Sequence, residues 1–329
     1  QILRHHNILT SKNFYRIFIL TSERNSERKK NIMKKQVTYL MLFFVMVLWT
    51  SGIMVAKTIG NSMGALEFSF WRWAVAVIFM APFAIPRVLT RMGEIQSKLR
   101  EVFLLGTFMA GGSTFLIWSV QMTTVFNASL FSATQPILTA ILIFLLFSRA
   151  LDKVQYLGII LGLFGSLIII SNLDMSLIMR MSFNQGDLLV ILAVLFYSLY
   201  AIYVNRWLSD FSALSVMFLS SVSTTLILSI IVFAFNDMSF NIHNSGLVGK
   251  IVYMAIFPTI IATTMWNAGI KALGPNKSSA FINLMPVLGI LVSVKFFKDP
   301  VQIHHILGMI LTCTGVMFVL REEKLDKDA

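Results

Sequence analysis

The sequence predicts an all-α integral membrane protein with ten transmembrane helices, arranged as two inverted repeats of five helices each. Three observations predict this architecture. The composition is apolar with few charges, ten apolar blocks are long enough to cross a bilayer, and the two halves resemble each other at a spacing of 150 residues.

The composition sets the class of protein. Of the 329 residues, 57% are hydrophobic and 13% are charged, whereas a soluble domain has about 45–50% apolar and about 25% charged residues. These fractions exclude a water-soluble enzyme and a disordered or collagenous chain. The single cysteine, Cys313, excludes a disulfide framework and a cysteine-rich zinc site. Of the formal net charge of +12, +7 lies in residues 1–35 and the rest between apolar blocks, so it does not indicate nucleic acid as a partner.

The apolar blocks give the expected spans, because a transmembrane helix needs about 20 mostly apolar residues. The ten blocks are 36–58, 65–85, 101–121, 125–147, 154–171, 186–206, 212–235, 249–269, 276–297 and 302–320. The longest connections, near 86–100 and 171–185, have 15 residues each, which is too short for a folded extramembrane domain. The function is therefore expected to lie among the helices.

The charges between the blocks predict the orientation, since Lys and Arg concentrate in short cytoplasmic flanks. With the N-terminus inside, the inner segments hold 21 Lys and Arg residues and the outer segments hold three. The remaining three, Lys57, Arg72 and Lys295, fall within helices. We expect a multi-pass protein of the bacterial inner membrane with both termini in the cytoplasm.

The expected organisation follows from the blocks and their charges. It comprises a basic cytoplasmic tail (1–35), a first five-helix repeat (36–171), an external loop (172–185), a second five-helix repeat (186–320) and a cytoplasmic C-terminal tail (321–329). Met33-Lys34-Lys35 directly before an apolar block resembles a bacterial start, and residues 1–32 are polar and unpatterned. We therefore expect residues 1–32 to lie upstream of the working protein.

The internal repeat is the most informative feature. Residues 127–170 align without a gap on 277–320, with matched prolines and glycines: Pro136 and Pro286, Gly158 and Gly308, Gly165 and Gly315. Five helices are an odd number, so the second copy must enter the membrane from the opposite side. Inverted repeats suit alternating access around a central site, which indicates a transporter.

Several ordered motifs resemble the EamA-type families of the drug/metabolite transporter superfamily, which are ten-helix carriers built as five plus five. They are Trp49-Thr50-Ser51-Gly52 with Lys57, Arg72 in Phe70-Trp71-Arg72-Trp73, Ala128-Ser129-Leu130 with Pro136, Gly158 to Gly165, and Gly186-Asp187. The resemblance covers residues 36–320. The family often has Glu-Arg-Leu or Glu-Pro-Leu after the proline helix, where this chain has Arg149-Ala150-Leu151 and Asp299-Pro300-Val301. Of these two copies, only Asp299 retains the family's acidic group.

The block boundaries place the matched prolines near the centres of their helices. A proline frees a backbone carbonyl and kinks a helix. Either Pro136 and Pro286 are hinges beside the substrate site, with Gln135 and Asn283 as polar lining, or they are static kinks satisfied by neighbouring helices.

Charged side chains within a membrane usually face a cavity or a partner. Arg72 lies about 10 Å inside the second helix, so we expect a functional role or an interhelical pair. Glu67 lies about 140° away from Arg72 around the same helix, which favours partners on other helices for both. Lys57 and Lys295 are close to outer helix ends and are expected to reach the headgroups.

Aromatic residues form the last candidates. Trp118 and Trp266 are related by the repeat and are either interface tryptophans or gates at the two ends of a pathway. Trp49 aligns with Tyr197, and Tyr197 and Tyr200 line either a cavity or a membrane interface. The glycine steps are expected to serve helix packing.

The expected function is a secondary carrier, with export the favoured direction, that moves a small metabolite by alternating access. Cationic residues outnumber acidic ones within the helices, which favours an amino acid, a derivative or an organic anion. The alternatives are a lipid-facing, flippase-like carrier and a non-transporting membrane sensor or assembly protein. No enzyme motif is present, so we expect no enzyme activity, no cofactor and no metal, with His304-His305 as a weak metal pair. The expected partners are the small-molecule substrate and membrane lipid, with a homodimer left open.

Overall fold

The computed structural model describes residues 33–56, 58–59, 62–123, 131–171, 173–174, 176, 179, 184–207, 209–235, 244–292 and 302–321. These residues contain helices and turns and no β-strand. The chain divides into two units, residues 1–41 and 42–329. The described part of the first unit, residues 33–41, begins the helix Met33–Ala56. The second unit contains the remainder of this helix and all the helices named below.

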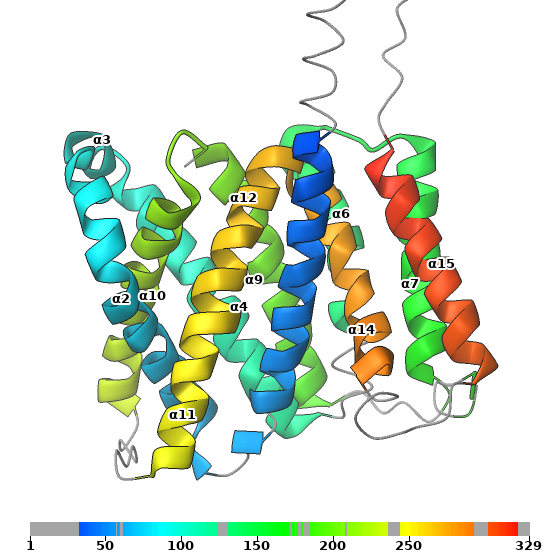
Figure 1. Cartoon of the computed structure of the whole chain (residues 1–329), viewed down its shortest axis with the longest axis horizontal. Coiled ribbons are helices and arrows are strands. Elements are labelled where there is room, and N and C mark those ends of the chain that lie inside the picture. The colour runs from blue at the N-terminus through cyan, green and yellow to red at the C-terminus, as the bar shows by residue number, and fades with distance from the viewer. Residues whose placement is uncertain are drawn as a thin grey trace, which may run out of the picture. The chain divides into compact units, whose positions relative to one another are not determined.

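Eight helices of the described chain are long and apolar enough to cross a membrane (Figure 1). They are Met33–Ala56, α2 (Ala65–Leu89), α4 (Leu99–Met122), α7 (Lys153–Ser171), α9 (Gln185–Trp207), α10 (Ala213–Phe235), the run Ser245–Leu273 and α15 (Ile303–Leu320). The run Ser245–Leu273 consists of α11 (Ser245–Met254), the π-helix η2 (Ala255–Ala262) and α12 (Thr263–Leu273). Eight of the ten predicted blocks are therefore confirmed as helices of spanning length.

The other two predicted blocks, 125–147 and 276–297, have an interrupted structure. In the first, a turn at residues 133–134 precedes α6 (Gln135–Phe147), whose 13 residues extend over about 20 Å, less than the bilayer core of about 30 Å. In the second, the helix changes type twice, through α13 (Pro275–Ser279), the 3-10 helix η3 (Ala280–Asn283) and α14 (Leu284–Val292).

The matched prolines lie at these interruptions. Pro136 was expected near the centre of its helix, and this is wrong, because it occupies the first turn of α6. Pro286 is the third residue of α14, directly after the 3-10 segment. A proline in a first turn removes no helical hydrogen bond, since that N–H has no partner within the helix. Both prolines thus lie near the start of a stretch of regular α-helix.

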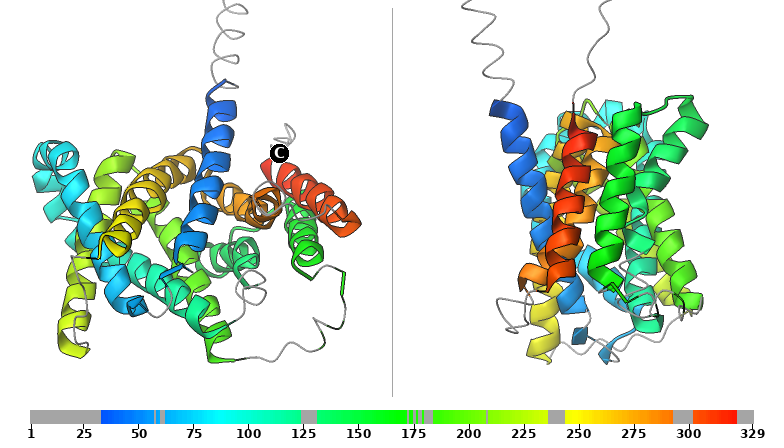
Figure 2. Two further views of the ribbon diagram at one scale, coloured as in Figure 1. Left: turned by 60° about the horizontal axis from the view of Figure 1, so that its bottom comes forward. Right: turned by 90° about the vertical axis from the view of Figure 1, so that its right-hand side faces the viewer.

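The helices α7 and α15 pack side by side through glycines (Figures 1 and 2). A Cβ atom on Gly315 would lie 2.5 Å from the carbonyl oxygen of Gly158, and one on Gly308 would lie 2.8 Å from that of Gly165. No side chain fits at such distances, so the absence of Cβ atoms lets the two backbones touch. The predicted packing role of these glycines is confirmed.

The same contact shows how the two halves are related. Along α7 the chain runs from Gly158 to Gly165, whereas the partners on α15 run from Gly315 back to Gly308, so the two helices are antiparallel. A shift of 150 residues converts the contact of Gly158 with Gly315 into that of Gly308 with Gly165. Equivalent helices that run in opposite directions are what inverted repeats require.

A second irregular segment is the π-helix η2, which contains Pro258. Proline cannot donate to the preceding turn, and single wide turns of this kind are frequent at functional sites. The carbonyl oxygen of Pro258 accepts a hydrogen bond of 3.1 Å from Trp49 Nε1. A Cβ atom on Gly52 would lie 2.9 Å from Pro258 Cγ, so this glycine allows the helix Met33–Ala56 to approach the proline.

Candidate functional site

The second unit contains a cavity of about 430 Å³, a volume typical of ligand pockets, which span about 300–1,000 Å³. The first half of the sequence contributes the helix Met33–Ala56, α2, α4 and residues 132–135 to its walls. The second half contributes α9, the run Ser245–Leu273, η3 and α14. Both predicted repeats therefore contribute to it.

Seven of the twelve candidate residues line this cavity: Trp49, Arg72, Gln135, Tyr197, Tyr200, Trp266 and Pro286. They are separated by up to 237 positions in the sequence and belong to six different helices. The structure thus gathers more than half of the predicted candidates around one space.

Of the other five candidates, the four that the structure describes do not line the cavity. Glu67, Pro136 and Asn283 are buried elsewhere between helices. The side chain of Trp118 is 44% exposed on the outside of the bundle, a position typical of a tryptophan at a membrane interface. Lys57 lies outside the described residues, as do Lys295 and Asp299.

Arg72 supplies the charge of the cavity. Its residue is 8% exposed, and its buried Nε atom has no hydrogen-bond partner within the described chain. The guanidinium carbon lies 5.4 Å from the ring centre of Trp73, a cation–π contact. Trp73 is held in turn by a hydrogen bond of 2.9 Å from its Nε1 to Ser113 Oγ on α4. The fold therefore places the arginine against the Trp73 ring and leaves its Nε–H donor without a partner within the described chain.

Aromatic side chains form much of the remaining wall. The rings of Trp49 and Trp266 lie 5.0 Å apart between centroids. The Tyr200 hydroxyl donates to Asn267 Oδ1 at 3.2 Å and accepts from Asn267 Nδ2 at 2.9 Å. Tyr197 packs against Gly112, where a Cβ atom would lie 2.9 Å from its ring. Each ring is thus placed by a specific hydrogen bond, ring contact or glycine.

At the expected cytoplasmic end, three cations hold the loop between α9 and α10. Arg91 Nη1 donates to the Asp210 carbonyl at 2.8 Å, Lys98 Nζ to the Trp207 carbonyl at 2.9 Å and Lys271 Nζ to the Phe211 carbonyl at 3.2 Å. The guanidinium of Arg91 also lies 4.2 Å from the ring centre of Phe211, which is 2% exposed. We call Arg91, Lys98, Lys271 and Phe211 the Phe211 cluster.

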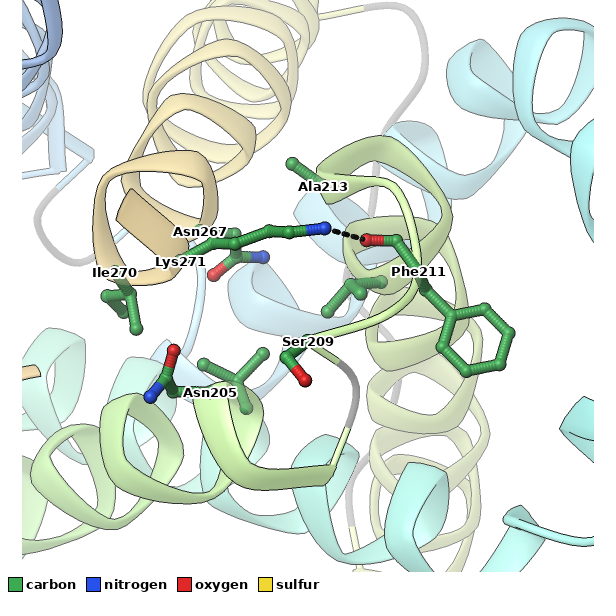
Figure 3. A pocket seen from close by; sticks show the side chains of 9 residues that line it. Asn205, Ser209, Phe211, Ala213, Asn267, Ile270 and Lys271 are labelled. Atoms are coloured by element: carbon green, nitrogen blue, oxygen red, sulfur yellow. Dashed lines mark hydrogen bonds between the residues drawn. The ribbon is translucent and has the colours of Figure 1, made fainter. Parts of the chain in front are cut away.

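The Phe211 cluster lies beside a pocket of only about 10 Å³, which Asn205, Asn267 and Lys271 help to line (Figure 3). Figure 3 shows the Lys271 side chain reaching across to the Phe211 carbonyl. Asn267 lines this pocket and binds Tyr200, which lines the large cavity. The bonded pair of Tyr200 and Asn267 therefore lies between the two spaces.

The sequence analysis did not identify several residues of the cavity wall, including Trp73, Ser113, Thr50, Thr259 and Pro258. Pro258 carried the same signal as Pro136, a proline inside an apolar block. Ser113 follows two glycines within the third block, a polar interruption of the kind that marks a cavity face. No sequence signal distinguishes Thr50 and Thr259 from other membrane threonines, because their orientation depends on helix rotation.

Comparison with known proteins agrees with this architecture. The chain is 26% identical over 288 residues to "Uncharacterized transporter YyaM" of Bacillus subtilis (strain 168), which covers 87% of this chain and 94% of the relative. It is 24% identical over 303 residues to "Uncharacterized transporter YetK" of the same organism, with coverages of 89% and 90%. A solved crystal structure matches with a TM-score of 0.66 at 17% identity over 86% of this chain and 96% of that chain, which shows a shared fold.

The family comparison covers most of the chain. The model of the EamA-like transporter family matches twice, at residues 36–171 and at residues 184–321. The two matches repeat the internal similarity seen in the sequence, and the relatives named above are themselves called transporters. The chain belongs to the EamA-like transporter family.

Proposed function

We propose that the protein is a secondary carrier that exports a small organic anion across the bacterial inner membrane by alternating access. The observation that carries the proposal is Arg72, a buried arginine that lines a cavity formed by both repeats. A charge at membrane depth is costly, by about 2.5–3.5 kcal/mol on the insertion scale. A bound anion offsets that cost and gives the arginine its partner.

The arrangement of the two ends supports alternating access. The cavity lining includes Met54 and Ala56 at the end of their helix and Val120 near the end of α4, so it extends toward the expected outer side. Toward the other side, the pair of Tyr200 and Asn267 and then the Phe211 cluster lie between the cavity and the expected cytoplasm. We propose that this conformation is closed at the cytoplasmic end, and that opening there requires the Phe211 cluster to separate.

Flux in proteoliposomes tests the proposed function. Purified protein should carry labelled organic anions along an imposed gradient, at rates well above those of protein-free vesicles of the same lipid. Flux of a fluorescent phospholipid between leaflets without flux of soluble anions would instead support a flippase-like carrier. Vesicles inactive in both assays would favour a sensor or assembly protein.

The proposed orientation gives a labelling prediction. In a Cys313→Ser background, the variant Ser62→Cys should react with an impermeant maleimide added outside intact cells, and Gln96→Cys should react only after lysis. Both positions are exposed: Ser62 lies just before α2, and Gln96 is the last residue of α3, which follows the other end of α2. The expected difference arises from the excess of cationic residues on the Gln96 side. The reverse pattern would overturn the orientation.

The Phe211 cluster gives a second prediction, on the conformation. Replacing Lys271 by Met removes one bond to the α9–α10 loop, so the cytoplasmic end should open more often. Maleimide labelling of Asn205→Cys, which lines the small pocket, should accelerate by about two- to fivefold, the effect of a partly exposed charged contact. The matched control Lys277→Met lies outside the cluster and should leave the rate unchanged. Equal labelling rates in both variants would show that the Phe211 cluster does not keep the cytoplasmic end closed.

A further inference from the structure

We infer that the substrate is an amphipathic organic monoanion: one carboxylate or similar planar anionic group attached to a flat, aromatic body, without a cationic group. The inference rests on the proposed function and narrows it to a substrate class. It draws on three properties of the cavity, namely its charge, its ring surfaces and its free hydroxyl groups.

The described lining of the cavity carries positive charge only. Within the described residues, Arg72 is the one charged side chain of the lining, and no Asp or Glu lines the wall. Asp187, a buried carboxylate of α9, is oriented away by hydrogen bonds with Thr123 and with the backbone N–H of Asn184. A substrate ammonium group would lose its hydration without gaining a carboxylate partner, which is costly. It would also share the cavity with the like charge of Arg72.

Three of the five ring side chains in the described lining present apolar surfaces, because the protein already satisfies their polar atoms. Trp49 Nε1 binds the Pro258 carbonyl at 3.1 Å and Trp73 Nε1 binds Ser113 Oγ at 2.9 Å. The Tyr200 hydroxyl is bound to Asn267. These residues therefore offer ring faces and edges instead of hydrogen-bond donors, and such surfaces prefer a flat apolar or aromatic group.

Aromatic faces also attract cations, but at Trp73 that interaction is already made within the protein. The guanidinium of Arg72 lies over Trp73 at 5.4 Å from the ring centre. A second cation near the same rings would be repelled by Arg72 at close range. The electrostatics of the wall thus select an anion beside a ring, and not an ammonium on a ring.

Two hydroxyl groups complete the polar surface. Thr50 Oγ1 and Thr259 Oγ1 are buried and lack a hydrogen-bond partner within the described chain, and both residues line the cavity. The two residues are 8% and 2% exposed. Buried hydroxyls are normally bonded, so these two are available to a ligand. Together with the Arg72 guanidinium, they give the described lining three side chains with donor capacity, and donors of this kind suit the oxygens of an anionic group.

Matched probes test the substrate class. Binding of four labelled or fluorescence-quenching probes to the purified full-length protein in nanodiscs is measured: phenylpropionate, butyrate without the ring, phenylpropylamine with the opposite charge, and phenylalanine with an added ammonium. Phenylpropionate should bind most tightly, with each of the others about tenfold weaker or more, since each lacks one matched group or adds an unpaired charge.

Two variants test whether residues of the cavity wall cause the expected preference among the probes. Arg72→Gln should remove the preference for phenylpropionate over neutral phenylpropanol, because the charge that distinguishes the two is gone. Trp266→Leu should weaken phenylpropionate several-fold and leave butyrate unchanged, because only the former has a ring. Both variants are compared at equal folded yield, judged by a monodisperse chromatographic profile.

The outcomes separate the substrate class from the proposed function. Absence of phenylpropionate binding, or tighter binding of phenylalanine or the amine, overturns the inferred class. If the inferred class is overturned but the protein transports solutes of another class in proteoliposomes, the proposed carrier function still holds. The expected binding order without flux of any probe in proteoliposomes supports the class and contradicts the carrier function.

Discussion

Exchanging Arg72 for glutamine is expected to lower the affinity of the cavity for an organic anion by about tenfold to a hundredfold, the value of a hydrogen-bonded charge. The residue is 8% exposed and lines the cavity, and within the described chain it has neither an ion pair nor a hydrogen bond. Neutralising it removes a costly buried charge without leaving a partner charge behind. The variant should therefore insert and fold at normal yield.

The measurements are membrane abundance, the chromatographic profile and anion uptake into proteoliposomes. Arg72→Lys is the conservative control, and it should also lose most of the activity, because an ammonium cannot reproduce the planar, forked guanidinium. A structural role would give a different pattern. If Arg72→Gln lowered folded yield and the second exchange Glu67→Gln restored it, the arginine would belong to a structural ion pair and not to the substrate site.

The largest expected effect on stability comes from Gly315→Ala. The added Cβ atom would lie 2.5 Å from the carbonyl oxygen of Gly158 and 2.5 Å from the backbone nitrogen of Gly162. Neither atom is at the end of a flexible side chain, so α7 and α15 must move apart along their contact. Overpacking of this kind costs about 1–3 kcal/mol, and the loss should appear as a lower melting temperature in detergent and a lower folded yield.

Gly249→Ala is the matched control. This glycine of α11 is exposed, and a Cβ atom there would meet nothing within 4 Å. Alanine is a better helix former than glycine by up to about 1 kcal/mol, so this variant should be unchanged or slightly more stable. Equal melting temperatures for Gly315→Ala and Gly249→Ala would contradict the close contact between α7 and α15.

Much of the fold was predictable because a bilayer leaves few alternatives to helices. Eight apolar blocks became long helices, since every backbone group in hydrocarbon must be bonded internally. Hydropathy reports the side chains and not the path of the backbone, which is why the turn before Gln135 was missed. Ala133 and Gln135 are buried at this turn, so neighbouring helices, which the local sequence does not encode, shield the irregular backbone from lipid.

A site residue was predictable from the sequence where placing its side chain within the membrane costs free energy. Arg72 was identified from its charge alone, and the structure places it in the cavity wall. Trp118 and Trp266 were equivalent by the repeat, yet one is 44% exposed and the other lines the cavity. A repeat predicts the depth of a residue, whereas the face it occupies depends on helix rotation, which changes by about 100° per residue. Tertiary packing alone decides that rotation.

The contact between α7 and α15 can form only late in the synthesis of the chain. The helix α7 ends at Ser171 and its partner begins at Ile303, so at about 5–20 residues per second the partner emerges on the order of ten seconds later. During that interval the glycine face of α7 has to rest against lipid, an insertion factor or a temporary neighbour. A nascent chain stalled before Ile303 should therefore be a strong substrate for membrane proteases, although it already contains every described residue of the cavity wall.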